Sequence, residues 1–141
     1  MATVSVDDRT TIADGIYEFY SLVDGGQAAR TEKLFTADAR LTFGPGSPKP
    51  GSLEGHDAIA AAMAAREAQT SAFTRHVVTN ITYQGSLDSI GVHYLLTLFR
   101  SDDETRDSRP AFVADVDERW VEKSGNWLIA ERTILPAFAR A

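Results

Sequence analysis

The chain of 141 residues contains no cysteine. This absence excludes disulfides, cysteine-ligated zinc, iron–sulfur clusters and thiol nucleophiles. No apolar run approaches the roughly 18 residues that suggest a membrane span. The segment 1–8 also lacks the basic and apolar regions of a signal peptide. We therefore expect a cytoplasmic protein that has no membrane partner.

Positive charge is also in short supply, with 14 Lys and Arg against 20 Asp and Glu, for a net charge of −6. An acidic domain repels phosphate backbones, so we expect no nucleic-acid partner. The three histidines, at 56, 76 and 93, do not have a metal-ligand spacing. Glycine-rich phosphate-binding spacings and a Gly-x-Ser-x-Gly elbow are missing too. These absences predict a protein that uses neither metal nor cofactor.

The first half of the chain reads as mainly helical. A length of 141 residues predicts a single domain over 1–141. Ile12, Ile16 and Val23 recur at helical spacing, and Gly25-Gly26 then ends the helix. Further helices are expected over 28–35 and 57–69. A short strand over 39–43 and a proline- and glycine-rich loop over 44–51 lie between them.

The second half of the chain predicts four long strands, over about 72–83, 88–100, 111–123 and 126–137. Helices followed by long antiparallel strands indicate an α+β fold. Because long strands twist, we expect a cone-shaped α+β barrel with three N-terminal helices on a curved, mostly antiparallel sheet. Such a cone would leave a hydrophobic pocket between helices and sheet.

Asp24, His76 and Arg132 form the trio that points most directly to chemistry. Histidine is the side chain most easily poised as a base near neutral pH, and a carboxylate behind it fixes its tautomer. Asp24 could supply that carboxylate, or it could bond local backbone amides instead. Arg132 has apolar neighbours and needs a partner. That partner could be a substrate anion, or one of three acids: Asp24, Asp115 and Asp117.

Several side chains are expected to line a pocket beside this trio. Alternation along the strand puts Thr74 and Asn80 on the face of His76, which is too polar for a dry core and fits either solvent or a lined cavity. His93 and Tyr94 point to opposite faces, so only one of them can face the cavity. The predicted substrate-binding residues are Tyr20, Phe19, Tyr94, His93 and Asn80.

Five segments give the chain, over about 8–137, a resemblance to the NTF2-like superfamily and its SnoaL-like group. They are Val23-Asp24-Gly25-Gly26-Gln27, Phe35-Thr36-Ala37-Asp38-Ala39, Gly55-His56-Asp57-Ala58-Ile59, His76-Val77-Val78-Thr79-Asn80 and Gly125-Asn126-Trp127-Leu128-Ile129. Within this group the chain is similar to scytalone dehydratase, bile acid 7α-dehydratase and hexachlorocyclohexane dehydrochlorinase. The resemblance places the acid of these His–Asp lyases on Asp24 and their base on His76. It places the arginine of the last two on Arg132.

The resemblance implies a cofactor-independent lyase or isomerase. His76 would remove a proton from a small hydrophobic cyclic substrate, with dehydration or elimination as the reaction. Phe19 stands where the dehydrochlorinase has lysine, and Val23 where scytalone dehydratase has tyrosine. The alternatives are a polyketide cyclase-type enzyme, or a non-catalytic ligand-binding or scaffolding subunit related to the small subunit of ring-hydroxylating dioxygenases.

The outer face of the predicted sheet reads as too apolar for solvent. Its candidate residues are Val77, Ile81, Phe112 and Trp120. A homo-oligomer that buries this face, a homodimer or a homotrimer, is therefore expected.

Overall fold

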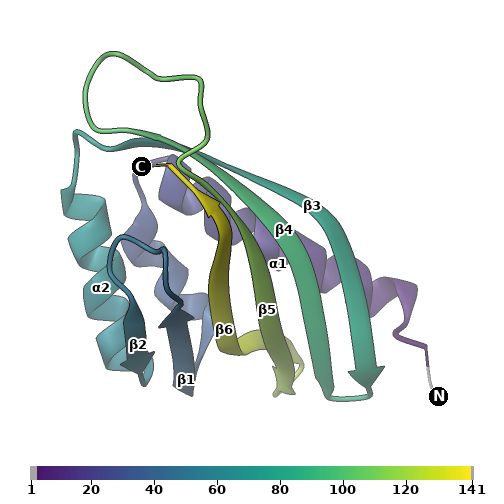
Figure 1. Ribbon diagram of the computed structural model, residues 1–141. Coiled ribbons are helices and arrows are strands. Elements are labelled where there is room, and N and C mark those ends of the chain that lie inside the picture. The colour runs from purple at the N-terminus through teal and green to yellow at the C-terminus, as the bar shows by residue number, and fades with distance from the viewer. Residues whose placement is uncertain (1–2, 141) are drawn as a thin grey trace.

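The computed structural model of the chain describes residues 3–140 and confirms the α+β class (Figure 1). Within this range no helix is long and apolar enough to cross a membrane. The elements follow in the order α1 (Val6–Asp24), the 3-10 helix η1 (Ala28–Leu34), β1 (Phe35–Phe43), β2 (Gly51–Glu54), α2 (His56–Ala68), β3 (Phe73–Ser86), β4 (Ser89–Ser101), β5 (Phe112–Lys123) and β6 (Asn126–Ala139).

The six strands form one mixed sheet in the order β2-β1-β6-β5-β4-β3. Neighbouring strands are antiparallel except β1 and β6, which run parallel. The long strands bend across α1, and α2 lies beside β1 and β2 (Figure 1). Two details of the predicted fold need correction. The middle helix is a 3-10 helix, and β1 and β2 precede α2, so the three helices are not contiguous at the N-terminus.

Helix α1 ends next to the sheet and places Asp24 there. The Ser5 side chain caps its start by accepting a hydrogen bond from the backbone N–H of Asp8 at 3.1 Å. The helix buries one stripe of side chains: Ile12, Ile16, Phe19, Tyr20 and Val23. The amide of Gly25 then bonds the carbonyl of Ser21, and Gly26 adopts the left-handed φ of 81° that ends the helix. Asp24 is therefore the last helical residue.

A β-bulge in β3 changes which residues face inward. Thr79 pairs with Leu95 and Thr82 with His93, so β3 carries one more residue than β4 between these pairs. Asn80, at the bulge, has a φ of 59° and is exposed. The prediction that Asn80 shares the face of His76 is wrong, because the extra residue interrupts the alternation. After the bulge, Ile81 packs against the core instead.

The inner face of the sheet holds the core. Trp120 is 1% exposed and packs against α1, where a Cβ at Gly15 would come within 2.7 Å of its ring. Ile81 and Phe112 also pack against the core. The placement of these three residues on an outer apolar face is therefore wrong. Of the four candidates only Val77 is an exposed large apolar side chain, at 44%.

Candidate active site

Asp24 and His76 meet where the end of α1 contacts β3. The Nδ1 atom of His76 lies 2.6 Å from Oδ1 of Asp24. The backbone N–H of His76 donates to Oδ2 of the same carboxylate at 2.8 Å. A carboxylate on Nδ1 places the ring proton there and leaves Nε2 as the atom with a free lone pair. The alternative in which Asp24 bonds only the amides that follow it is wrong, since those of Gly25 and Gly26 bond helix carbonyls.

The same contacts set the acidity of Asp24. Burial acts to raise the pKa of this carboxyl group. Hydrogen bonds from the ring and backbone of His76, the charge of that ring and a hydrogen bond from Thr74 outweigh burial, and the pKa of Asp24 is lowered. The carboxylate is therefore the form of Asp24 that the fold stabilises.

Thr74 and Arg66 support the carboxylate from behind. The buried hydroxyl of Thr74 donates to Oδ1 of Asp24 at 2.8 Å. In turn it accepts a hydrogen bond from Arg66, in the last turn of α2, at 3.0 Å. Partial burial lowers the pKa of Arg66. Sequence reasoning placed Thr74 on the face of His76 but gave it no role, and it missed Arg66 because the contact joins α2 to β3.

His76 is enclosed but reachable. Its side chain is 12% exposed and that of Asp24 is 13% exposed. The ring of Tyr20 stacks on the imidazole with centroids 4.8 Å apart and an interplanar angle of 28°. Within residues 3–140 no side chain or backbone group bonds Nε2. One ring nitrogen is thus held by Asp24 while the other remains available to a ligand.

Arg132 points into the core and pairs with Glu118. The guanidinium Nε donates to Oε2 of Glu118, and the two side chains are 1% and 0% exposed. The predicted alternatives of an ion pair with Asp24, Asp115 or Asp117 are wrong, because none of these acids contacts Arg132. Burial acts to lower the pKa of Arg132, but the charge and hydrogen bond of Glu118, together with Tyr94 and Tyr20, outweigh burial and the pKa is raised.

Glu118 also forms hydrogen bonds with other polar groups in the core. It accepts hydrogen bonds from the Tyr94 hydroxyl and from Nε1 of Trp120, each at 2.8 Å. The Tyr94 hydroxyl also bonds that of Tyr20 at 2.8 Å. Burial is the main cause that raises the pKa of Tyr20 to about 12, against the opposing charge of Arg132. Sequence reasoning missed Glu118, although its place between Val116 and Trp120 on alternating positions marks it as an acid on a buried face.

Tyr20 therefore connects the His76–Asp24 pair to the Arg132–Glu118 pair. Its ring centroid lies 4.8 Å from that of His76 and 5.4 Å from the guanidinium carbon of Arg132. The Phe19 ring lies 3.9 Å from the same guanidinium carbon. Of the predicted pocket-lining residues, Tyr20 and Phe19 contact members of the trio, whereas Tyr94 bonds Tyr20 and Glu118.

His93 and Asn80 lie elsewhere. His93 is on the outer sheet face, where its Nε2 bonds Asp115 at 2.9 Å. This settles which of His93 and Tyr94 faces inward, because Tyr94 is fully buried. Asn80 is exposed at the bulge of β3. Neither His93 nor Asn80 contacts the site.

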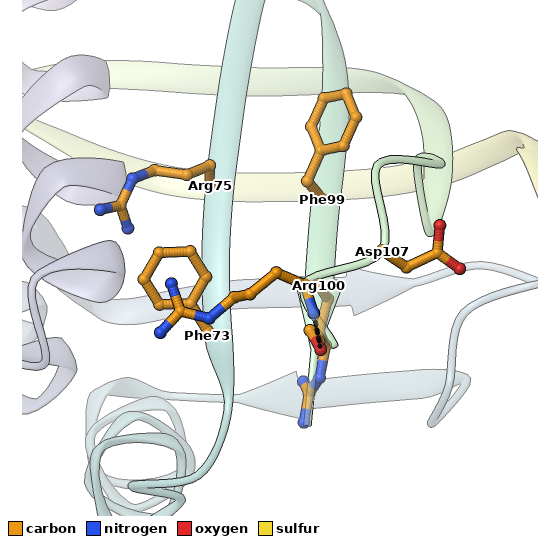
Figure 2. A pocket seen from close by; sticks show the side chains of 7 residues that line it. Phe73, Arg75, Phe99, Arg100 and Asp107 are labelled. Atoms are coloured by element: carbon orange, nitrogen blue, oxygen red, sulfur yellow. Dashed lines mark hydrogen bonds between the residues drawn. The ribbon is translucent and has the colours of Figure 1, made fainter. Parts of the chain in front are cut away.

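Large side chains occupy the space that the sequence predicted as a hydrophobic pocket. The buried residues there are Phe19, Tyr20, Tyr94, Trp120 and Arg132. Two of the surface pockets formed by residues within 3–140 are lined by neither Asp24 nor His76. One lies where β3 begins and β4 ends (Figure 2). The other is lined by Ala37, Glu54, Gly55, His56 and Asp57. Aromatic rings therefore pack beside His76 and Arg132 in the core.

Comparisons with known proteins agree with the fold. The chain is similar to an NTF2-like protein with a cystatin-like fold from Novosphingobium aromaticivorans, at 18% identity and a TM-score of 0.80 over 96% of this chain and 86% of that one. A candidate scytalone dehydratase from the same organism has 14% identity and a TM-score of 0.78 over 96% and 87%. ActVI-ORFA from Streptomyces coelicolor has 16% identity and a TM-score of 0.76 over 94% and 98%.

These identities are low enough that the structural likeness establishes the fold and leaves the reaction open. No curated relative matches the sequence. The model of the SnoaL-like domain family matches residues 4–133, nearly the whole chain. The protein therefore belongs to the SnoaL-like domain family and has the NTF2-like fold that its sequence motifs predicted.

Proposed function

We propose that the protein is a cofactor-independent lyase or isomerase in which His76 is the general base. The observation that carries this proposal is the 2.6 Å contact between Asp24 and Nδ1 of His76, with no partner for Nε2 within residues 3–140. A base must offer a lone pair within hydrogen-bond reach of the proton that it removes. Nε2 meets this requirement because Asp24 fixes the other nitrogen as the proton carrier.

The reaction would begin with transfer of a carbon-bound proton to Nε2 of His76. That proton needs a neighbouring carbonyl or leaving group to acidify it, since imidazole is a mild base. Asp24 would stabilise the imidazolium that forms, and Thr74 would hold the carboxylate in place. Positioned acid–base catalysis of this kind contributes about 10²–10⁴-fold. For a dehydration, the imidazolium would return the proton from Nε2 to the departing hydroxyl group, which leaves as water; another leaving group would depart as its anion.

Negative charge would develop on the substrate as the proton leaves. Arg132 is the buried cation beside Tyr20, and within residues 3–140 its Nη2 atom has no hydrogen-bond partner. Part of its charge is already matched by Glu118. We infer that Arg132 stabilises the developing anion across the ring of Tyr20, which lies between it and His76. The aromatic surroundings favour a small hydrophobic cyclic substrate. The fold shared with a candidate scytalone dehydratase supports dehydration by analogy only.

Exchange of carbon-bound hydrogen for deuterium tests this proposal without knowledge of the natural substrate. Cyclic ketones and cyclic β-hydroxyketones would be incubated in D2O with the protein, and exchange and water loss would be followed by proton NMR. We expect His76→Ala to lose about 10²–10⁴-fold of the rate on any active compound. His93→Ala is the matched control, because His93 also bonds an aspartate at 2.9 Å but lies on the outer face. Full activity in His76→Ala would refute the assignment.

A second candidate function is a non-catalytic ligand-binding or scaffolding subunit. The observation that favours it is the filled interior, in which Tyr20, Tyr94 and Trp120 are all at most 5% exposed. It predicts no exchange activity in either the parent or the His76 variant. Purification from the source cell would then bring down a larger partner in fixed ratio. If the protein instead shows exchange activity, and keeps that activity after any such partner is removed, the result favours the enzyme over the non-catalytic subunit.

A further inference from the structure

A pocket on the outer face of the sheet lies behind His76. Alternate residues of β3 point to opposite faces, so Phe73 and Arg75 point away from the side of His76. Phe99 of β4 pairs with Arg75 and shares that outer face. The segment after β4 contributes Arg106, and the pocket that results has a volume of about 180 Å³ (Figure 2).

Two phenylalanines and three arginines form most of the wall of this outer pocket. Phe73 and Phe99 are only partly buried. The guanidinium carbon of Arg106 stacks 3.5 Å from the centroid of the Phe73 ring, and that of Arg75 lies 4.5 Å from it. An apolar cavity of roughly 150 Å³ holds one benzene molecule. The outer pocket therefore matches a single six-membered ring in size and in lining.

Two of its arginines carry charge that no acid neutralises. Within residues 3–140, neither Arg75 nor Arg106 forms an ion pair, and Arg75 donates only to the carbonyl of Thr74 at 2.7 Å. Arg100 differs, because its Nη2 atom donates hydrogen bonds to Asp102 at 2.9 Å and to Gln69 at 3.2 Å. Apart from the bond between Arg75 and Thr74, neither stacked guanidinium group donates a hydrogen bond to another group within residues 3–140. The N–H donors of a guanidinium group match the two oxygens of a carboxylate.

The backbone holds Arg106 in this position. Its φ of 51° is in the left-handed region, which is uncommon for a residue other than glycine. Its N–H donates to Oγ of Ser101 at 3.3 Å. Asp107, the acid that lines the pocket, is held by Arg109 at 2.7 Å and Arg140 at 3.6 Å. Asp107 therefore does not compete for Arg75 or Arg106.

We propose that this outer pocket binds a small monocyclic carboxylate. The ring would pack on Phe73 and Phe99, and the carboxylate would bind the guanidinium groups of Arg75 and Arg106. The site is on the face of β3 opposite His76, so it is independent of the proposed reaction.

Titration of the ¹⁵N-labelled full chain with sodium benzoate tests this proposal. We expect saturable shifts of the amide signals over 73–75 and 99–107. Benzyl alcohol has the ring without the charge, and acetate has the charge without the ring, so each should bind at least tenfold more weakly. Arg75→Gln and Arg106→Gln should each weaken benzoate binding at least tenfold. Arg119→Gln, on β5 beside Glu131, is the matched control and should bind like the parent. His76→Ala should also keep the benzoate affinity while losing any exchange activity.

The proposal is wrong if benzoate causes no saturable shifts in these segments, or if benzyl alcohol binds as tightly. Unchanged affinity in both arginine variants would also overturn it. If the same signals move with protein concentration instead of benzoate, and sedimentation shows association, the outer pocket is a contact between copies of the chain and the small-molecule proposal is rejected.

Discussion

The buried ion pair between Arg132 and Glu118 makes a sharp prediction about stability. Glu118→Gln keeps the shape of the side chain but removes the charge that matches Arg132. Both side chains are at most 1% exposed, so the arginine would remain charged and without compensation in the core. Breaking a buried pair in this way costs about 3–5 kcal/mol. The free energy of unfolding of a native domain is roughly 5–15 kcal/mol, so this single substitution would remove a large fraction of it.

Two further variants, Arg132→Met and the double variant, separate the contribution of the charges to stability from that of side-chain packing. Arg132→Met should cost less than Glu118→Gln, because Glu118 keeps its hydrogen bonds from Tyr94 and Trp120. The double variant Glu118→Gln, Arg132→Met should be more stable than the sum of the two single losses predicts, by about 1 kcal/mol or more. Urea unfolding of all four proteins at pH 7, followed by circular dichroism, gives these values. A Glu118→Gln loss below about 1 kcal/mol would refute the reasoning that this pair is buried and coupled.

Three further predictions concern the dyad and the surface. Thr74→Val removes the hydroxyl that donates to Asp24, so it should lower stability by about 0.5–1.5 kcal/mol in urea unfolding, with Thr74→Ser close to the parent; equal values for the two variants would contradict this. The pKa of Asp24 is lowered in the folded state, so its contribution to stability is present above the ordinary carboxyl pKa of about 4 and is lost as the pH falls through the lower folded value. The stability difference between the parent and Asp24→Asn should therefore be constant well above about pH 4 and shrink as the pH falls below it, and a difference that stays constant in acid would exclude the linkage. We also propose a homodimer or homotrimer through the outer sheet face, where Val77 and Leu135 are 44% and 43% exposed; Val77→Asp should shift sedimentation toward the monomer, and a monomeric parent would exclude it.

Local sequence signals predicted the elements closely. The predicted strand over 126–137 is observed as Asn126–Ala139, and the predicted helix over 57–69 as His56–Ala68. Helical spacing, glycine stops and hairpin turns act over a few residues, so they survive in any tertiary context. The order of helices and strands failed in detail because β2, only four residues long, follows a segment that reads as a loop.

Errors arose where one residue depends on a distant strand. The bulge of β3 turns Asn80 outward, and it is defined only by the register with β4. The partner of Arg132 is Glu118, fourteen positions away on the neighbouring strand β5, and that pairing requires the register of β5 with β6. Alternation marks which residues share a face but does not say which face the helices cover.

The sequence by itself determined where the chemically useful residues lie along the chain. Asp24 had to close a helix because two glycines follow it, and His76 had to lie within a strand of alternating polarity. Only the tertiary structure decided that the two meet at 2.6 Å, that Arg132 turns to Glu118 and that Phe19, Tyr20, Tyr94 and Trp120 are buried in the core. The physical reason is that these contacts join α1 to β3 and β5 to β6. Packing and strand register fix such contacts, and a pattern that spans only a few neighbouring residues predicts neither of them.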